Sequence, residues 1–238
     1  MLGVNGSGTT LLVRLLASHP QIRGLPKEGQ RLTHALLLPR NYGVSRLWTE
    51  RPDVFRLDQN EGADRADRAQ HDWALHFPPG PGVLLEKSPP NTLRALWLQR
   101  YFRPNRFVAT TRSPYAVAEG IRRRQDSSIE DAARHWARAY DCLLADAEQL
   151  GHLLWVRYEE LCENPERELD RIEGFLTLPE PFDRAILNSD FDVHSLEPGP
   201  HPISDFNAKS LARLSPDDIA TIGRVAGPTM ERLGYERL

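Results

Sequence analysis

A glycine-rich segment near the N-terminus, Gly3-Val4-Asn5-Gly6-Ser7-Gly8-Thr9-Thr10, constrains this chain more than any other stretch. Residues 2–4 have the pattern of a strand end. Leucines at helical spacing follow the segment: Leu11, Leu12, Leu15 and Leu16. Gly6 and Gly8 permit backbone angles that other residues resist, so the loop can turn several N–H groups toward one point at the start of a helix. The sequence predicts strand, loop and helix, with an anion site, most simply for a phosphate, at the loop.

The loop differs at one position from the loop that binds nucleoside triphosphates. That loop reads G-x-x-x-x-G-K-[ST], and its lysine reaches the β- and γ-phosphates. Gly3 and Gly8 have the required spacing, but Thr9 stands where the lysine belongs. The loop therefore has N–H and hydroxyl donors for a phosphate and lacks the cation that a triphosphate needs. An ordinary strand-to-helix turn remains the alternative.

Length and composition narrow the class of protein. The chain has 238 residues and a net charge of −3, which favours one α/β domain and argues against a general nucleic-acid binder. No apolar run approaches the roughly 20 residues of a membrane span, and no secretory signal is visible. Cys142 and Cys162 do not make a disulfide framework and suit a reducing compartment, so a cytoplasmic protein is expected.

Lysine is rare in this chain, which draws attention to Lys87. Of the 30 basic residues only Lys27, Lys87 and Lys209 are lysines. A short apolar strand, 83–85, is followed by Glu86-Lys87-Ser88-Pro89-Pro90. Ligands of parallel α/β sheets bind beyond the carboxyl ends of the strands, so Lys87 is expected at the ligand-binding edge. The alternative is an exposed surface lysine.

Two further strands are followed by charged residues. Residues 21–25 are predicted as a strand, and Glu28 follows them in a loop. Residues 106–111 form another strand that ends at Arg112, and Arg124 lies on the helix after it. A basic strand end followed by a basic helix indicates a second anion site. For each of these residues a solvated surface charge is the alternative.

Strands and helices alternate along the chain. About five short strands are expected, which implies an α/β fold with a three-layer, doubly wound parallel sheet and P-loop NTPase-like topology. The expected strands are 2–4, 21–25, 83–85, 106–111 and 153–156. Long helices are expected to begin at Asn91, Pro114, Ile129, Pro165 and Ser215. Residues 31–81, with a short helix at 32–37, are expected as an insertion that could form a substrate lid within a single domain, 1–238.

These segments together resemble the sulfotransferase superfamily, whose members use 3′-phosphoadenosine 5′-phosphosulfate (PAPS). The resemblance covers nearly the whole chain, and the pattern is most similar to the branch that contains tyrosylprotein sulfotransferases and their bacterial relatives. The segments that carry it are 7–12 with His19-Pro20, 107–124, 156–166 and 227–235.

The resemblance implies a role for each matching residue. Glu28 would be the base on the acceptor hydroxyl, with His34 as the alternative base, and Lys87 would meet the transferring sulfuryl group and the leaving phosphate. The loop would hold the 5′-phosphosulfate, and two arginines the 3′-phosphate. The implied donor-binding residues are Asn5, Gly6, Ser7, Gly8, Thr9, Thr10, Arg112, Gly120, Arg124, Tyr158 and Arg213, with Ser210 as an alternative to Arg213. No metal is expected, because a sulfuryl group has fewer charged oxygens than a phosphoryl group.

The chain departs from the family pattern at two glycines. Gly6 stands where the family usually has Lys or Arg, and Gly120 where it usually has Ser. Each lost contact is worth about 1–3 kcal/mol of donor-binding free energy unless another donor replaces it.

Two alternative functions stay open: a P-loop kinase or nucleotide hydrolase with Glu86 as its metal-linked acid, and a nucleotide-binding relative that has lost its chemistry. The acceptor hydroxyl could belong to a small molecule or a peptide, and the sequence does not indicate the oligomeric state.

Overall fold

The computed structural model describes residues 1–80, 82–193 and 199–238. Pro81, at the end of the expected insertion 31–81, and residues 194–198 lie outside the described residues. Within them, the strands form two parallel pairs, β1 with β2 and β3 with β4. The strands are β1 (Ile22–Gly24), β2 (Val83–Leu85), β3 (Phe107–Thr111) and β4 (Leu153–Arg157).

The N-terminal residues lie between the two strand pairs. The Leu2 N–H donates to the Val108 carbonyl at 2.9 Å, and the Thr110 N–H donates to the Leu2 carbonyl at 3.0 Å. Toward the other strand pair, the Met1 nitrogen donates to the carbonyl of Glu86, the residue directly after β2, at 2.7 Å. The parallel order along the layer is therefore β1, β2, residues 1–2, β3 and β4.

The continuous five-strand sheet expected from the sequence is not formed, because the middle position holds a single bridge, Leu2 to Ala109. The extended backbone ends after Leu2 because of the next residue, Gly3. Gly3 has φ of 137°, outside the strand region, and its N–H donates to the Thr92 hydroxyl at 2.9 Å instead of to a strand. The extended backbone thus ends where the loop begins.

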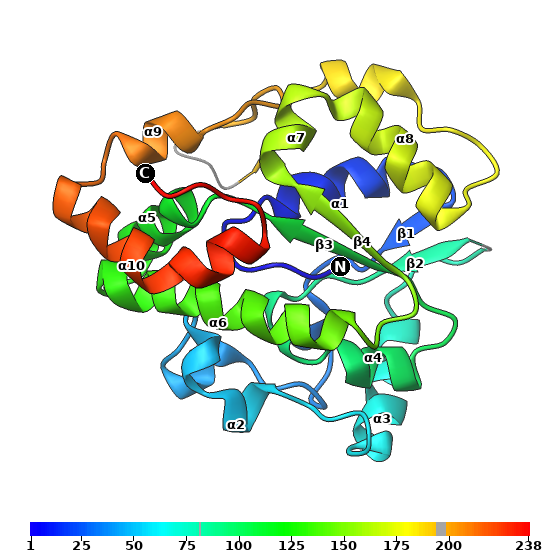
Figure 1. Cartoon of the computed structure of the whole chain (residues 1–238). Helices are drawn as coiled ribbons and strands as arrows, with labels where there is room; N and C mark the ends of the chain where they lie inside the picture. The colour runs from blue at the N-terminus through cyan, green and yellow to red at the C-terminus, as the bar shows by residue number, and fades with distance from the viewer. Residues whose placement is uncertain (81, 194–198) are drawn as a thin grey trace.

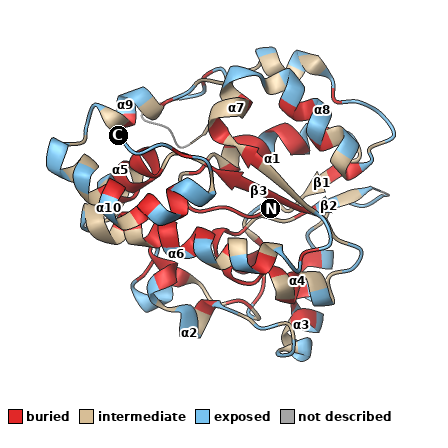
Figure 2. Ribbon diagram, viewed as in Figure 1, coloured by how far each residue is buried: buried red, intermediate tan, exposed pale blue. Residues whose placement is uncertain are grey.

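Helices cover both faces of the strands, which gives three layers (Figure 1). The helices are α1 (Thr9–Ala17), α2 (Pro52–Phe55), α3 (Ala63–Ala74), α4 (Ala95–Tyr101), α5 (Pro114–Arg124), α6 (Ile129–Ala147), α7 (Tyr158–Glu163), α8 (Pro165–Leu176), α9 (Asn207–Leu211) and α10 (Pro216–Arg232). Successive residues of β3 point to opposite faces. Val108 packs with the leucines of α1 and α8, whereas Phe107 and Ala109 pack with α5, α6 and α10. Figure 2 shows β3 buried between these layers.

Most helix boundaries follow the expected sequence signals. α5 and α8 begin at Pro114 and Pro165, and the Ser215 side chain caps α10 in a capping box with Asp218. The helix expected from Asn91 is instead divided at Arg94 into a 3₁₀ turn and α4. Asn91 does not cap α4, since its amide contacts the Glu86 carboxylate and the buried Arg94 guanidinium. The division follows from this buried polar contact.

Residues 31–80 pack into the core next to α6. Trp48, Phe55 and Trp73 are buried there at 0%, 1% and 5% exposure. The short helix expected at 32–37 is not formed, and these residues have bends and irregular backbone instead. The 3₁₀ turns of the chain are η1 (Gly29–Arg31), η2 (Pro39–Tyr42), η3 (Trp48–Glu50), η4 (Pro89–Leu93) and η5 (Arg184–Asn188). Among the described residues, no helix combines the length and the apolar character needed to cross a bilayer.

Candidate active site

A pocket of about 510 Å³ opens beyond the carboxyl ends of the strands. The loops after residues 1–2, β1, β2 and β3 and the start of α7 all reach it, because parallel strands end at one edge of a sheet. The sequence-predicted residues that line it are Asn5, Gly6, Gly8, Thr9, Thr10, Glu28, Lys87, Arg112, Gly120, Arg124, Tyr158 and Ser210. The structure does not bring Ser7, His34 or Arg213 to its lining.

The glycine loop and the start of α1 line the pocket. Gly6 and Gly8 both have φ of 89°, which glycine adopts without strain. α1 begins at Thr9, so the N–H groups of its first turn have no partner inside the helix. A Cβ at Gly8 would lie 2.7 Å from the Tyr158 ring, so glycine is required there for packing as well. The loop can therefore hold an anion through backbone donors.

Ser7 lies beneath this loop. It is fully buried, and its hydroxyl donates to the Val4 carbonyl at 2.8 Å and lies 3.0 Å from the Thr110 hydroxyl. The expectation that the Ser7 hydroxyl holds a phosphate thus finds no support in the geometry. The side chain fixes the loop to β3 instead.

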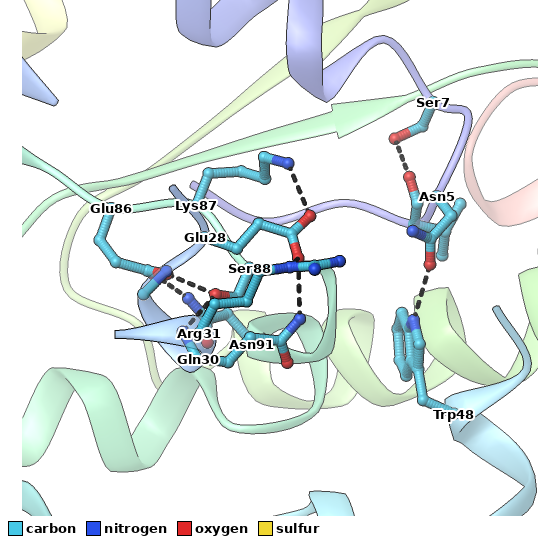
Figure 3. Close-up of polar contacts among 12 residues, drawn as sticks. Asn5, Ser7, Glu28, Gln30, Arg31, Trp48, Glu86, Lys87, Ser88 and Asn91 are labelled. Carbon is cyan, nitrogen blue, oxygen red and sulfur yellow. Dashed lines mark hydrogen bonds and ion pairs between the residues drawn. The ribbon is translucent and has the colours of Figure 1, made fainter. Parts of the chain in front are cut away.

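Glu28 and Lys87 meet in the pocket, although 59 positions separate them (Figure 3). Lys87 Nζ lies 3.0 Å from Glu28 Oε1, and the two side chains are 16% and 20% exposed. Glu28 Oε2 accepts hydrogen bonds from Gln30 at 3.0 Å and from Arg31 at 3.3 Å. A carboxylate and an ammonium group are thus held together at the strand ends, in reach of a bound molecule.

The environment of Glu28 keeps it ionised. Burial acts to raise its pKa, but the charge of Lys87 and the hydrogen bonds from Gln30 and Lys87 outweigh it, with a smaller contribution from Arg31. The pKa of Glu28 is therefore lowered from its ordinary value of 4.5. At neutral pH Glu28 is a carboxylate, the form that can accept a proton.

Glu86, next to Lys87, has a structural role: its carboxylate holds two loops together. One of its oxygens accepts hydrogen bonds from the Gly29 N–H at 3.0 Å and the Ser88 hydroxyl at 2.6 Å, and the other contacts Asn91. It does not line the pocket. These bonds join the loops after β1 and β2, which carry Glu28 and Lys87. The kinase alternative therefore lacks the metal-linked acid that it requires.

Arg112 is held rigidly at the end of β3. Its Nε donates to the Asn207 side chain at 2.7 Å, and one terminal nitrogen donates to the Gly6 carbonyl at 3.1 Å. Its guanidinium lies over the Tyr158 ring, 4.0 Å from the centroid. The guanidinium is thus fixed between the glycine loop and the start of α7.

Sequence reasoning missed several pocket residues from segments without a regular pattern. Arg46 and Trp48 come from residues 31–81, and His201 and Phe206 come from the segment before α9. No periodicity or motif marks these segments. Arg123, on α5, also lines the pocket. Among the described residues, no group of three or more His, Cys, Asp or Glu side chains could hold a metal ion.

The fold and the pocket define an α/β protein in which a glycine loop, a carboxylate, a lysine and an arginine line one pocket at the carboxyl ends of parallel strands. The sequence model of the sulfotransferase family matches residues 1–183. The chain therefore belongs to the sulfotransferase family, as the resemblance predicted.

Individual relatives agree with this family. Protein-tyrosine sulfotransferase A of Caenorhabditis elegans is 24% identical over 260 residues, which cover 98% of this chain and 66% of that protein. Protein-tyrosine sulfotransferase 1 of Danio rerio is 25% identical over 261 residues, covering 98% and 71%. The sulfotransferase domain of the Synechococcus PCC 7002 olefin synthase has the same fold, with a TM-score of 0.63 at 21% identity over 99% of this chain and 93% of that domain. The chain spans about two-thirds of the length of the two tyrosine sulfotransferases.

Proposed function

We propose that this chain transfers a sulfuryl group from PAPS to the hydroxyl group of an acceptor. The observation that carries the proposal is the Glu28–Lys87 pair at 3.0 Å in the pocket that also holds the glycine loop and Arg112. Base, cation and anion site are parts of one pocket built from separate strand ends. Such a reaction relies on positioning and charge stabilisation more than on covalent chemistry.

Each residue has one task in this proposal. Glu28 accepts the proton of the acceptor hydroxyl, whose oxygen forms the new bond to sulfur. The bond between sulfur and the bridging phosphate oxygen breaks, and Lys87 neutralises the charge that grows on that oxygen. The first-turn N–H groups of α1 and the side chain of Thr10 hold the 5′-phosphosulfate. Arg112 and Arg124 bind the 3′-phosphate as charged hydrogen-bond donors.

The wall around Tyr158 is suited to the adenine base. The Tyr158 hydroxyl donates to the Ser204 carbonyl at 2.8 Å and accepts from the Phe206 N–H at 3.2 Å. These bonds fix the segment before α9 across the pocket, and His201 and Phe206 contact each other edge to face. The apolar side chains of Phe191, Val193 and Phe206 also line the pocket, and such a lining favours a nucleoside over a free anion.

Binding of the product nucleotide tests this function. Isothermal titration calorimetry should show that 3′,5′-adenosine bisphosphate binds in the presence of EDTA, because the arginines and N–H groups supply the positive charge. A transfer assay with PAPS and a panel of phenols, alcohols and tyrosine peptides should then show sulfated product. Binding of ATP with Mg²⁺ and none of the bisphosphate would contradict the proposal. Nucleotide binding without transfer to any acceptor would identify a relative that has lost its chemistry.

The class of acceptor and the cellular compartment are also part of this proposal. The relatives named above are protein-tyrosine sulfotransferases, so tyrosine peptides are the first acceptors to test, with small phenols and alcohols beside them. Burial raises the pKa of Cys142 to about 11 and that of Cys162 to about 12, and both thiols are free. Unreactive, unbridged thiols are consistent with a cytoplasmic protein, which stays a prediction.

The lowered pKa of Glu28 predicts the acid limb of the pH profile. A base whose pKa is lowered stays ionised to lower pH, so kcat/KM should decline through Glu28 only below pH 4.5, its ordinary value. Because Arg31 contributes to this lowering, Arg31→Ala should move the acid limb to higher pH. Initial rates from about pH 3 to 8, at subsaturating substrate, measure both effects. An acid limb near pH 6.5 would instead indicate a histidine base.

A further inference from the structure

Two glycines leave open space in the proposed donor site. Gly6 and Gly120 line the pocket, and a Cβ built at either position meets no atom of the described residues within 4 Å. Gly120 lies about one helical turn before Arg124 on α5, so the two positions share a helix face. The space beside the expected 3′-phosphate site is therefore not filled by a side chain from α5 at position 120.

Arg46 reaches this part of the pocket from the segment before η3. Its backbone N–H donates to the side-chain oxygen of Gln125, directly after Arg124, at 2.8 Å. Two residues later, the buried Trp48 donates from Nε1 to the side-chain oxygen of Asn5 at 3.0 Å (Figure 3). Residues 46–48 are thus tied to the end of α5 on one side and to the glycine loop on the other. Between these ties the half-buried Arg46 side chain lines the pocket.

The charges around Arg46 favour an anion. Burial lowers the pKa of Arg124, and the charges of Arg123 and then Arg46 lower it further, each more than Arg112 does. Burial likewise lowers the pKa of Arg46, which Glu28 partly offsets and Arg123 reinforces. Arg123 forms an ion pair with Glu119 at 3.0 Å. Half-buried guanidinium groups that repel one another are stabilised when an anion binds among them.

We propose that Arg46 binds the 3′-phosphate of the donor nucleotide together with Arg124, and so replaces the hydroxyl that is missing at Gly120. The proposal rests on the proposed function, because it requires a donor with a 3′-phosphate. A guanidinium offers a planar fork of N–H donors where serine offers one hydroxyl. The segment that carries Arg46, residues 46–48, therefore completes the donor site, in addition to any contact with the acceptor.

The experiment compares two nucleotides that differ only in the 3′-phosphate. Arg46→Ala should weaken binding of 3′,5′-adenosine bisphosphate by about 10- to 100-fold, the usual range for a charged hydrogen bond, and change binding of 5′-AMP by less than about twofold. Arg46→Lys should lose less, because it keeps the charge. Arg138→Ala is the control, since Arg138 is exposed on α6 and outside the pocket lining. Calorimetry gives the affinities, and thermal denaturation shows that each variant is folded.

The possible outcomes separate the proposals. Equal losses for both nucleotides would place Arg46 at the 5′ side and overturn the inference. An unchanged bisphosphate affinity with a raised KM for the acceptor would assign Arg46 to the acceptor, next to Glu28, and overturn it too. If the wild-type protein binds no bisphosphate at all, the sulfotransferase proposal itself fails, before any variant is compared.

A double variant tests whether a side chain at position 120 can replace the contact that Arg46 makes. Position 120 has room for a side chain, so Gly120→Ser in the Arg46→Ala background should restore part of the lost bisphosphate affinity, by about fivefold or more. The same change should leave 5′-AMP binding unaltered. Absence of any restoration in a folded double variant would contradict the idea that the two positions serve one phosphate.

Discussion

Glu28→Gln should lower kcat by about 10²–10⁴-fold, the range that general base catalysis contributes, while the Kd for 3′,5′-adenosine bisphosphate changes by less than about threefold. The amide has nearly the shape of the carboxylate and cannot take the acceptor proton. Gln30 and Arg31 donate to Glu28, so the side chain is held in place before substrate binds. Single-turnover kinetics with PAPS and a tyrosine peptide, together with calorimetry, measure the two quantities.

The matched control is Glu50→Gln. Glu50 is exposed at the end of η3, and its replacement removes the same charge outside the pocket lining. We expect its kcat to stay within about twofold of the wild type. His34 is exposed and also outside the pocket lining, so His34→Ala should behave like the control. A large loss in His34→Ala and none in Glu28→Gln would transfer the base to the histidine.

Much of the pocket could be predicted from sequence because its residues follow strands. Glu28, Lys87 and Arg112 each come after a strand that the sequence predicts, and the structure gathers all three in one pocket. The parallel order of the strands is sufficient for this, since it brings every carboxyl end to one edge. The family resemblance adds roles to these positions, and the roles stay predictions.

Other features depend on contacts that no local pattern records. Arg46 is positioned by the Gln125 side chain, and Trp48 by Asn5, so their places follow from how residues 31–80 pack on the rest of the chain. The direction of the Ser7 side chain depends on Thr110, 103 positions away. Asn91 has the sequence context of a helix cap, yet a buried carboxylate holds it. Tertiary hydrogen bonds decide each of these cases.

The strand expected at residues 2–4 is a further feature whose exact extent the local sequence does not predict. A strand was expected at residues 2–4, but only Leu2 forms a bridge, because the backbone turns at Gly3. A Cβ at Gly3 would lie 2.3 Å from the Thr110 hydroxyl, so the turn and the close approach to β3 both require glycine. Glycine spacing predicted the loop correctly but did not show how early the strand would end.

Lys87→Ala should reduce kcat by about 10²–10³-fold, the usual cost of removing one donor that stabilises transition-state charge, and weaken bisphosphate binding by only a few-fold. The reason is that the leaving oxygen gains its charge during transfer, when Lys87 acts. Lys27→Ala is the control, because Lys27 is exposed in the same region and does not line the pocket. Steady-state kinetics and calorimetry give the two losses, and equal losses would reassign Lys87 to ground-state binding.

The same variant has a second consequence, which a merely structural lysine outside the pocket would not produce. Lys87 helps to hold the pKa of Glu28 low, so its removal should move the acid limb of kcat/KM to higher pH, whereas Lys27→Ala should leave that limb in place. The residual activity of Lys87→Ala, compared with the wild type and Lys27→Ala between about pH 3 and 8, measures the shift. A lowered kcat with an unmoved acid limb would mean that Glu28 is not the base whose ionisation the profile reports. Together the two readouts test whether the base and the cation act as one pair, as their 3.0 Å contact implies.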